Sequence, residues 1–89
     1  MLRKNIEIIN KLGMHARAAA KFVTLAQTFK SEIKVSRNDR EVNGKSIMGM
    51  MMLAAAKGTT IEIIIDGEDE QQAIELLCGL INNLFDENE

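Results

Sequence analysis

The sequence predicts a two-layer α/β (α+β) sandwich, in which helices cover one face of a sheet and the elements follow the order β-α-β-β-α-β-α. Two kinds of pattern favour this fold. Segments that alternate apolar and polar residues, typical of half-buried strands, are interspersed with segments whose apolar residues recur three and four apart, typical of amphipathic helices. With 89 residues and no internal repeat, the chain is expected to form one domain spanning residues 1–89.

The first half of the chain predicts a strand, a helix and a hairpin. Residues 2–9 alternate between apolar and polar side chains and are expected to form the first strand. In the helix that follows, Lys21 and Gln27 are expected to face solvent. Residues 32–43 predict two strands, because alternating residues flank the turn-forming segment Arg-Asn-Asp-Arg. The apolar stripe of the helix consists of Ala18, Phe22, Leu25, Ala26 and Phe29.

The second half predicts a short helix, a strand and a final helix. Ser46 stands where an N-cap would serve a helix from residue 47 to about 54, and a Lys-Gly pair at 57–58 is typical of its end. The fourth strand is expected at residues 59–66. Asp69, with a glutamine three residues later, matches a capping box for the final helix. The buried stripe of that helix is expected to be Ala73, Ile74, Leu77, Cys78, Ile81 and Leu84.

Composition excludes several classes of protein. The formal net charge of −2 argues against general nucleic-acid binding, which requires a basic surface. The single cysteine, Cys78, cannot form an intramolecular disulfide and is expected to be a buried small hydrophobe. With one histidine far away in the sequence, it offers no recognisable metal cluster. We therefore expect neither a metal nor a cofactor.

Hydropathy indicates a cytoplasmic protein that does not insert into membranes. The longest apolar stretch, residues 47–56, is far shorter than the ~20 residues that a membrane-spanning helix needs. Polar residues Asn5 and Glu7 interrupt the N-terminal region, so no signal-peptide hydrophobic segment develops. The acidic segment 86–89 is expected to be solvated and frayed.

The only histidine, His15, lies between a glycine turn and an alanine-rich helix. Gly13 allows the chain to turn, and the alanines start the helix, so His15 falls at or just before its first turn. Unpaired backbone N–H groups and the aligned peptide dipoles favour an anion at such a helix start. Arg17 adds a cationic fork within reach of the same place. A neutral imidazole is nucleophilic, so this arrangement suits a histidine that accepts a phosphoryl group.

A plainer interpretation of the same residues stays open on periodicity alone. A lone histidine near a helix start can simply cap the helix or occupy the surface. On this interpretation the chain is a small regulatory or dimerising α/β module with no phosphotransfer.

The amino-acid sequences of three segments favour the phosphoryl-accepting histidine over the module without phosphotransfer. Residues 13–17 read Gly-Met-His-Ala-Arg, residues 44–49 read Gly-Lys-Ser-Ile-Met-Gly, and residues 56–59 read Ala-Lys-Gly-Thr. In order and spacing these segments resemble those of the histidine-containing phosphocarrier proteins, HPr, of the phosphoenolpyruvate-dependent phosphotransferase system. The resemblance covers nearly the whole chain. It implies a four-stranded antiparallel sheet in the order 1-4-2-3 with three helices on one side.

The resemblance also implies a mechanism and partners. The enzyme called enzyme I, charged by phosphoenolpyruvate, would pass its phosphoryl group to Nδ1 of His15, which would pass it to a IIA domain, while Arg17 stabilises the phosphate. The chain would thus be a phosphocarrier and not an independent enzyme. A nitrogen-related branch of the family, which signals to regulatory proteins, is the alternative within this class. The implied docking surface comprises Ala20, Lys45, Ile47, Met48 and Met51.

The segment after Ser46 has two interpretations that are compatible. Its methionines are core filling or, where exposed, a docking patch, since methionine side chains adapt to several partners. Ser46 is an N-cap and, by resemblance, also the target of a regulatory HPr serine kinase/phosphorylase. A phosphate there adds about −1.5 to −2 charges and would hinder docking.

One departure from the family pattern concerns the start of the first helix. Ala18 stands where the family commonly has proline, which presets the first helical turn. Because alanine is an excellent helix former, we expect a slightly looser turn without loss of function.

Overall fold

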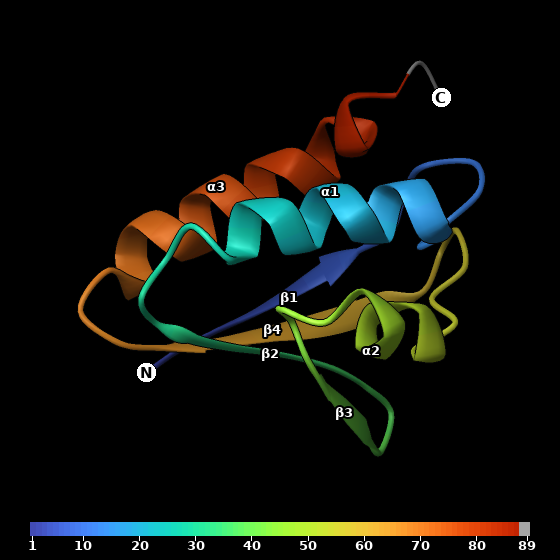
Figure 1. Cartoon of the computed structure of the whole chain (residues 1–89). Coiled ribbons are helices and arrows are strands. Elements are labelled where there is room, and N and C mark those ends of the chain that lie inside the picture. Colours follow the sequence, from blue (N-terminus) through green and yellow to red (C-terminus); the bar gives the residue numbers. More distant parts are fainter. Residues whose placement is uncertain (88–89) are drawn as a thin grey trace.

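The sheet of this protein has four antiparallel strands, as seen in a computed structural model that describes residues 1–87. The strands pair in the order β1-β4-β2-β3 (Figure 1), which confirms the expected order 1-4-2-3. Their bounds are Leu2–Glu7 for β1, Glu32–Arg37 for β2, Arg40–Asn43 for β3 and Thr60–Asp66 for β4.

The central strand β4 provides much of the core. Its alternate residues Ile61, Ile63 and Ile65 are buried, as their two-residue period predicts. Ile64 is also buried, although it belongs to the opposite face. Its cross-strand neighbours are Arg3 and Lys34, whose long aliphatic stems are suited to covering an apolar side chain on a solvated face.

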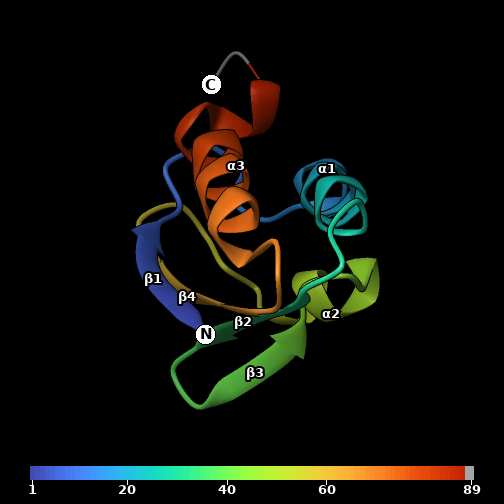
Figure 2. The ribbon, with the colours of Figure 1, turned by 90° about the vertical axis from the view of Figure 1, so that its left-hand side faces the viewer.

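Three helices cover one face of the sheet (Figure 2): α1 (Ala16–Ala26), α2 (Ile47–Met52) and α3 (Glu70–Asn82). Phe22 of α1 and Leu77 of α3 are fully buried, as the helical stripes predict. Helix α2 contacts α1, and Figure 1 shows it below the N-terminal end of α1, so the turn that precedes α1 and the whole of α2 lie in the same part of the molecule. The predicted two-layer sandwich is confirmed.

The end of α2 differs from the prediction. The helix stops at Met52, and Ala54, with φ of 53°, takes the left-handed position that we expected from the Lys-Gly pair. Two guanidinium groups satisfy the terminal carbonyls: Arg37 Nη1 donates to Leu53 O (2.8 Å) and Arg40 Nη1 to Met52 O (2.7 Å). The β2–β3 hairpin thus caps the C-terminal end of α2, a contact that sequence periodicity does not report.

The start of α3 also differs, because Asp69 does not form the predicted capping box. It is the N-cap residue, but its side chain makes no capping hydrogen bond. Instead its carboxylate accepts hydrogen bonds from Lys30 N (2.8 Å), Ser31 N (3.0 Å) and Ser31 Oγ. Asp69 thus ties the start of α3 to the chain that enters β2.

Two predictions about the end of the chain are wrong. Cys78 is half-buried rather than buried, and partial burial raises the pKa of its thiol. Within the acidic segment 86–89, Asp86 is exposed as predicted, but Glu87 is not frayed, because its side chain is only 15% exposed and its carboxylate contacts His15. Residues 88 and 89 of the expected frayed segment lie outside the described residues.

Candidate functional site

His15 is the N-cap residue of α1. Its backbone is extended (φ −77°, ψ 177°), and its Nδ1 accepts a hydrogen bond from the backbone N–H of Arg17 at 3.3 Å. The predicted position at the helix start is therefore confirmed, and the ring itself acts as the cap. A quarter of the side chain is exposed, so the imidazole can be reached from solvent.

The turn before His15 is held by close backbone contacts. Gly13 has φ of 66°, and a Cβ atom there would lie 2.6 Å from Ala55 O, so both its conformation and its surroundings require glycine. Met14 is buried, and its N–H donates to Ala55 O at 2.8 Å. The backbone that carries the ring is thus anchored to the segment that follows α2.

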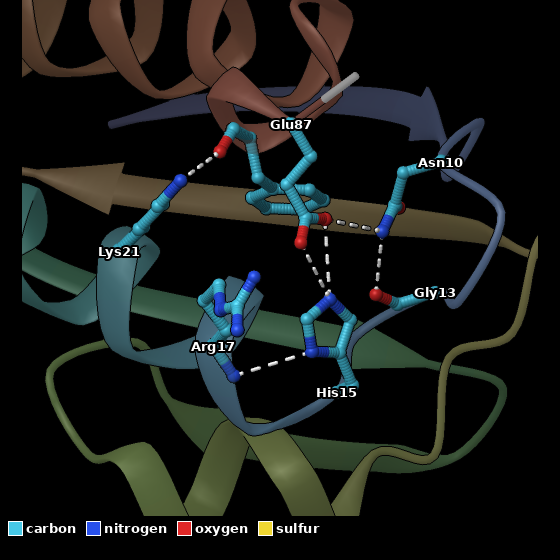
Figure 3. Close-up of polar contacts among 7 residues, drawn as sticks. Asn10, Gly13, His15, Arg17, Lys21 and Glu87 are labelled. Atoms are coloured by element: carbon cyan, nitrogen blue, oxygen red, sulfur yellow. Dashed lines mark hydrogen bonds and ion pairs between the residues drawn. The ribbon is translucent and has the colours of Figure 1, made fainter. Parts of the chain in front are cut away.

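The other ring nitrogen of His15 contacts the C-terminal segment, as Figure 3 shows. His15 Nε2 lies 3.1 Å from both carboxylate oxygens of Glu87. The hydrogen bond from His15 lowers the pKa of the Glu87 carboxyl, so Glu87 is ionised and can only accept. Nε2 must therefore carry the proton, and Nδ1, which accepts from Arg17 N, keeps its lone pair.

Asn10 joins this contact to the turn. Its Nδ2 donates to Gly13 O at 2.8 Å and to Glu87 Oε1 at 3.4 Å, and the side chain is fully buried (Figure 3). The turn and the C-terminal segment are thus fixed by one amide group.

A sharp turn over Leu84–Asp86 brings Glu87 to the ring. All three residues have positive φ, between 54° and 62°, which costs about 1–2 kcal/mol for each non-glycine residue. Burial of Phe85 offsets this cost, and Lys21 Nζ donates to Phe85 O at 2.8 Å. Lys21 is consequently half-buried rather than directed outward as predicted.

Arg17 is the cation nearest to His15 in the sequence, and its side chain is exposed. Among residues 1–87 its guanidinium has no hydrogen bond or ion pair, so it is free to bind an anion. The side chain lies beside the ring (Figure 3) and borders a groove of about 520 Å³ between α1 and α3. The groove is lined by Arg17, Ala20, Lys21, Thr24, Leu25, Thr28, Leu80 and Asp86.

Ser46 caps α2, as predicted. Its Oγ accepts from Gly49 N at 3.0 Å, and its carbonyl accepts from Met50 N at 3.0 Å. The neighbouring Lys45 is half-buried, and its Nζ donates to Phe29 O at 2.7 Å. The ammonium group of Lys45 is thus partly engaged within the protein.

The methionine-rich helix α2 is buried on one side and exposed on the other. Met50 is fully buried, whereas Met48 has 73% of its surface exposed. An exposed apolar patch of this kind is typical of a surface that binds other proteins. Of the proposed docking residues, Ile47, Met48 and Met51 are exposed, and Ala20 is half-buried. Leu12, in the turn before α1, and Met52, at the end of α2, are two further exposed apolar side chains.

Comparison with known proteins agrees with this geometry. A family profile described as "PTS HPr component phosphorylation site" matches residues 2–83. Phosphocarrier protein HPr of Neisseria meningitidis serogroup A is 62% identical over 89 residues, and that of Cupriavidus necator is 55% identical, in both cases over 100% of each chain. The chain belongs to the HPr family. The crystal structure of HPr-C-His from Thermoanaerobacter tengcongensis has the same fold, with a TM-score of 0.96, 44% identity and full coverage of both chains.

As a member of the HPr family, the protein is a phosphocarrier of the phosphotransferase system. Within residues 1–87 no helix has the length and apolar character needed to cross a membrane. In the same part of the chain no group of three or more His, Cys, Asp or Glu side chains is arranged to hold a metal ion.

Sequence reasoning missed two residues that contact the HPr histidine or its turn. Phe85 lies four positions after Ile81, so periodicity predicts its burial, but no signal in the sequence places Glu87 beside His15. Nothing in the sequence distinguishes Asn10, whose amide acts only on groups brought together by the fold.

Proposed function

We propose that His15 is the phosphoryl acceptor and donor of this phosphocarrier, receiving the group from enzyme I and passing it to IIA domains. The observation that supports this most directly is the asymmetry of the ring. Nε2–H is held by Glu87, whereas Nδ1 faces the backbone N–H of Arg17 over a long 3.3 Å contact. Nδ1 is therefore the nitrogen whose lone pair can attack phosphorus.

The transfer balances without an additional acid or base. The Nδ1 lone pair forms the N–P bond, and the bond between phosphorus and the donor breaks with its electron pair going to the donor. The Arg17 N–H then loses its ring acceptor and can donate to a phosphoryl oxygen, at a helix start that favours anions. The exposed Arg17 guanidinium is suited to stabilising the charge on the transferred group. In the reverse step the electron pair returns to Nδ1.

The exposed apolar side chains of α2 support a shared docking surface for the donor and the acceptor. Ile47, Met48 and Met51 lie on the helix that packs next to the start of α1, so a partner that covers them can also reach His15. Flexible methionines allow two different partners to use the same surface in turn. Because the proposed chemistry uses phosphoenolpyruvate, an intracellular metabolite, it takes place in the cytoplasm.

Ser46 is the proposed site of regulation by an HPr serine kinase/phosphorylase. It is half-buried at the edge of the exposed apolar side chains, directly before Ile47 and Met48. A phosphate there would place about two negative charges beside the apolar docking surface. A docking partner would have to remove water from these charges, and its own negative charges would be repelled. Phosphorylation of Ser46 is therefore expected to weaken docking without unfolding the protein.

The test is the intact mass of the protein after incubation with phosphoenolpyruvate and enzyme I. We expect one added phosphoryl group that is labile in acid and stable in base, as befits phosphohistidine. The adduct should be absent from His15→Ala and present in the matched control Ser46→Ala. If wild-type protein gains no adduct, the small regulatory or dimerising module without phosphotransfer becomes the better interpretation.

A further inference from the structure

The C-terminal segment gives His15 a partner from the opposite end of the chain. Glu87 is 72 residues away in sequence, yet both of its carboxylate oxygens lie 3.1 Å from Nε2. Only 15% of the Glu87 side chain is exposed, so water competes weakly for this contact. Figure 3 shows the carboxylate at the edge of the ring that carries Nε2, while Nδ1 points toward the Arg17 backbone.

The segment holds this position against a backbone cost. Three consecutive non-glycine residues, Leu84–Asp86, adopt the left-handed region, and such conformations persist only where the surroundings over-determine them. Phe85 in the core and the bond from Lys21 Nζ to Phe85 O fix the turn. Asn10 Nδ2 then orients the Glu87 carboxylate from the side. The segment is therefore built to present a carboxylate to the ring.

We infer that Glu87 is a positioning residue for phosphotransfer. Its carboxylate holds Nε2–H of His15, so that Nδ1 is the nitrogen available as the nucleophile. The same carboxylate balances the positive charge of the phosphorylated ring. This inference rests on the proposed function of His15. When neutral imidazole attacks through Nδ1, the proton stays on Nε2 and the ring becomes an N-phosphoryl imidazolium with a positive charge. The Glu87 carboxylate accepts the hydrogen bond from Nε2–H before and after the transfer, and it neutralises the new charge in place.

The geometry leaves the phosphoryl group room beside the carboxylate. Glu87 contacts the Nε2 edge of the ring, and the incoming group bonds to Nδ1, toward the free guanidinium of Arg17. Glu87 and Arg17 thus stabilise opposite charges: the carboxylate stabilises the cationic ring, and the guanidinium stabilises the anionic phosphoryl group.

The first test measures the ring without any phosphotransfer. In ¹⁵N-labelled protein, NMR of His15 should find the proton on Nε2, with a resonance protected from exchange with water. Glu87→Ala should lose this protection, and Glu87→Gln, whose amide oxygen can still accept, should keep part of it. Asp86→Asn is the matched control, because it removes the neighbouring charge at a position where asparagine tolerates the positive φ; it should retain full protection.

The second test measures loading of the same proteins by enzyme I. Glu87→Ala should lower kcat by about tenfold, the size expected for one charge-assisted hydrogen bond, with KM unchanged. Glu87→Gln should fall between Glu87→Ala and the wild type, and Asp86→Asn should match the wild type. Equal kcat in wild type and Glu87→Ala, or equal protection of Nε2–H, would overturn the inference. Failure of the wild type itself to load would instead overturn the proposed function.

Discussion

The starts of α1 and α2 are alike in local structure and differ in what the rest of the chain adds to them. His15 and Ser46 are both N-cap residues with extended backbone, and each accepts a hydrogen bond from a backbone N–H of its own helix. Ser46 accepts its hydrogen bond from Gly49 N, and beyond this bond its side chain only borders an exposed apolar surface. The His15 ring has a second polar edge, and Glu87 from the far end of the chain holds it.

This difference shows how one local motif can serve two purposes. A hydroxyl cap has one oxygen, so its capping bond and its proposed modification use the same atom. An imidazole cap has two nitrogens, and the fold can fix one while leaving the other available. The proposed roles of the two helix starts, group transfer at α1 and regulation at α2, follow from this distinction.

We expect the largest effect from a substitution at the start of α1 that leaves the capping hydrogen bond of His15 in place. Arg17→Ala keeps the backbone N–H that donates to His15 but removes the free guanidinium, and it should lower the rate of loading by enzyme I about a hundredfold. The free energy of unfolding should change little, because the side chain is exposed. Arg3→Ala, which removes an exposed guanidinium on β1, is the control and should load normally. An unchanged rate in Arg17→Ala would remove the phosphate-binding role.

A smaller effect is expected when charge is added at the α2 start. Ser46→Asp should slow loading about tenfold by placing a charge beside the apolar docking surface. Ser46→Ala should load at the wild-type rate, although loss of the cap lowers the free energy of unfolding by about 1 kcal/mol. Loading kinetics and urea unfolding of both variants separate these effects. Equally slow loading of Ser46→Ala would mean that the hydroxyl, and not the added charge, matters.

We expect the smallest effect at the start of α3, a third helix start that can be compared with those of α1 and α2. Hydrogen bonds from the Ser31 hydroxyl and from the Lys30 backbone N–H hold the pKa of the Asp69 carboxyl below its ordinary value of 3.8. Such a carboxylate contributes its full stability above that value, and the contribution is lost as the pH falls toward the lowered folded-state pKa. Between about pH 4 and pH 2, the free energy of unfolding of the wild type should therefore fall more steeply than that of Asp69→Asn.

Urea unfolding as a function of pH measures this slope. Asp39→Asn, in the exposed turn between β2 and β3, is the matched control and should keep the wild-type slope. Identical slopes for Asp69→Asn and wild type would contradict the tie between α3 and β2.

Features that depend on neighbours in sequence could be predicted. The alternation of Ile61, Ile63 and Ile65 indicated a strand because successive side chains of a strand point to opposite faces. Ser46 indicated a helix start because its hydroxyl reaches a backbone N–H three residues away. The same reasoning failed at Asp69, where Ser31 competes successfully for the carboxylate, and at the end of α2, where the hairpin arginines bind the last carbonyls.

The sequence by itself determined the periodic elements, their order and the position of His15 at a helix start, because these depend on the local geometry of the backbone and on residues a few positions apart. The resemblance to a known family supplied the strand order. Only the tertiary structure decided which ring nitrogen of His15 is held, because the carboxylate that holds it arrives through a buried phenylalanine and a left-handed turn at the other end of the chain. A contact between residues 72 positions apart leaves no periodic trace, since each partner is an ordinary polar residue until the core brings them together.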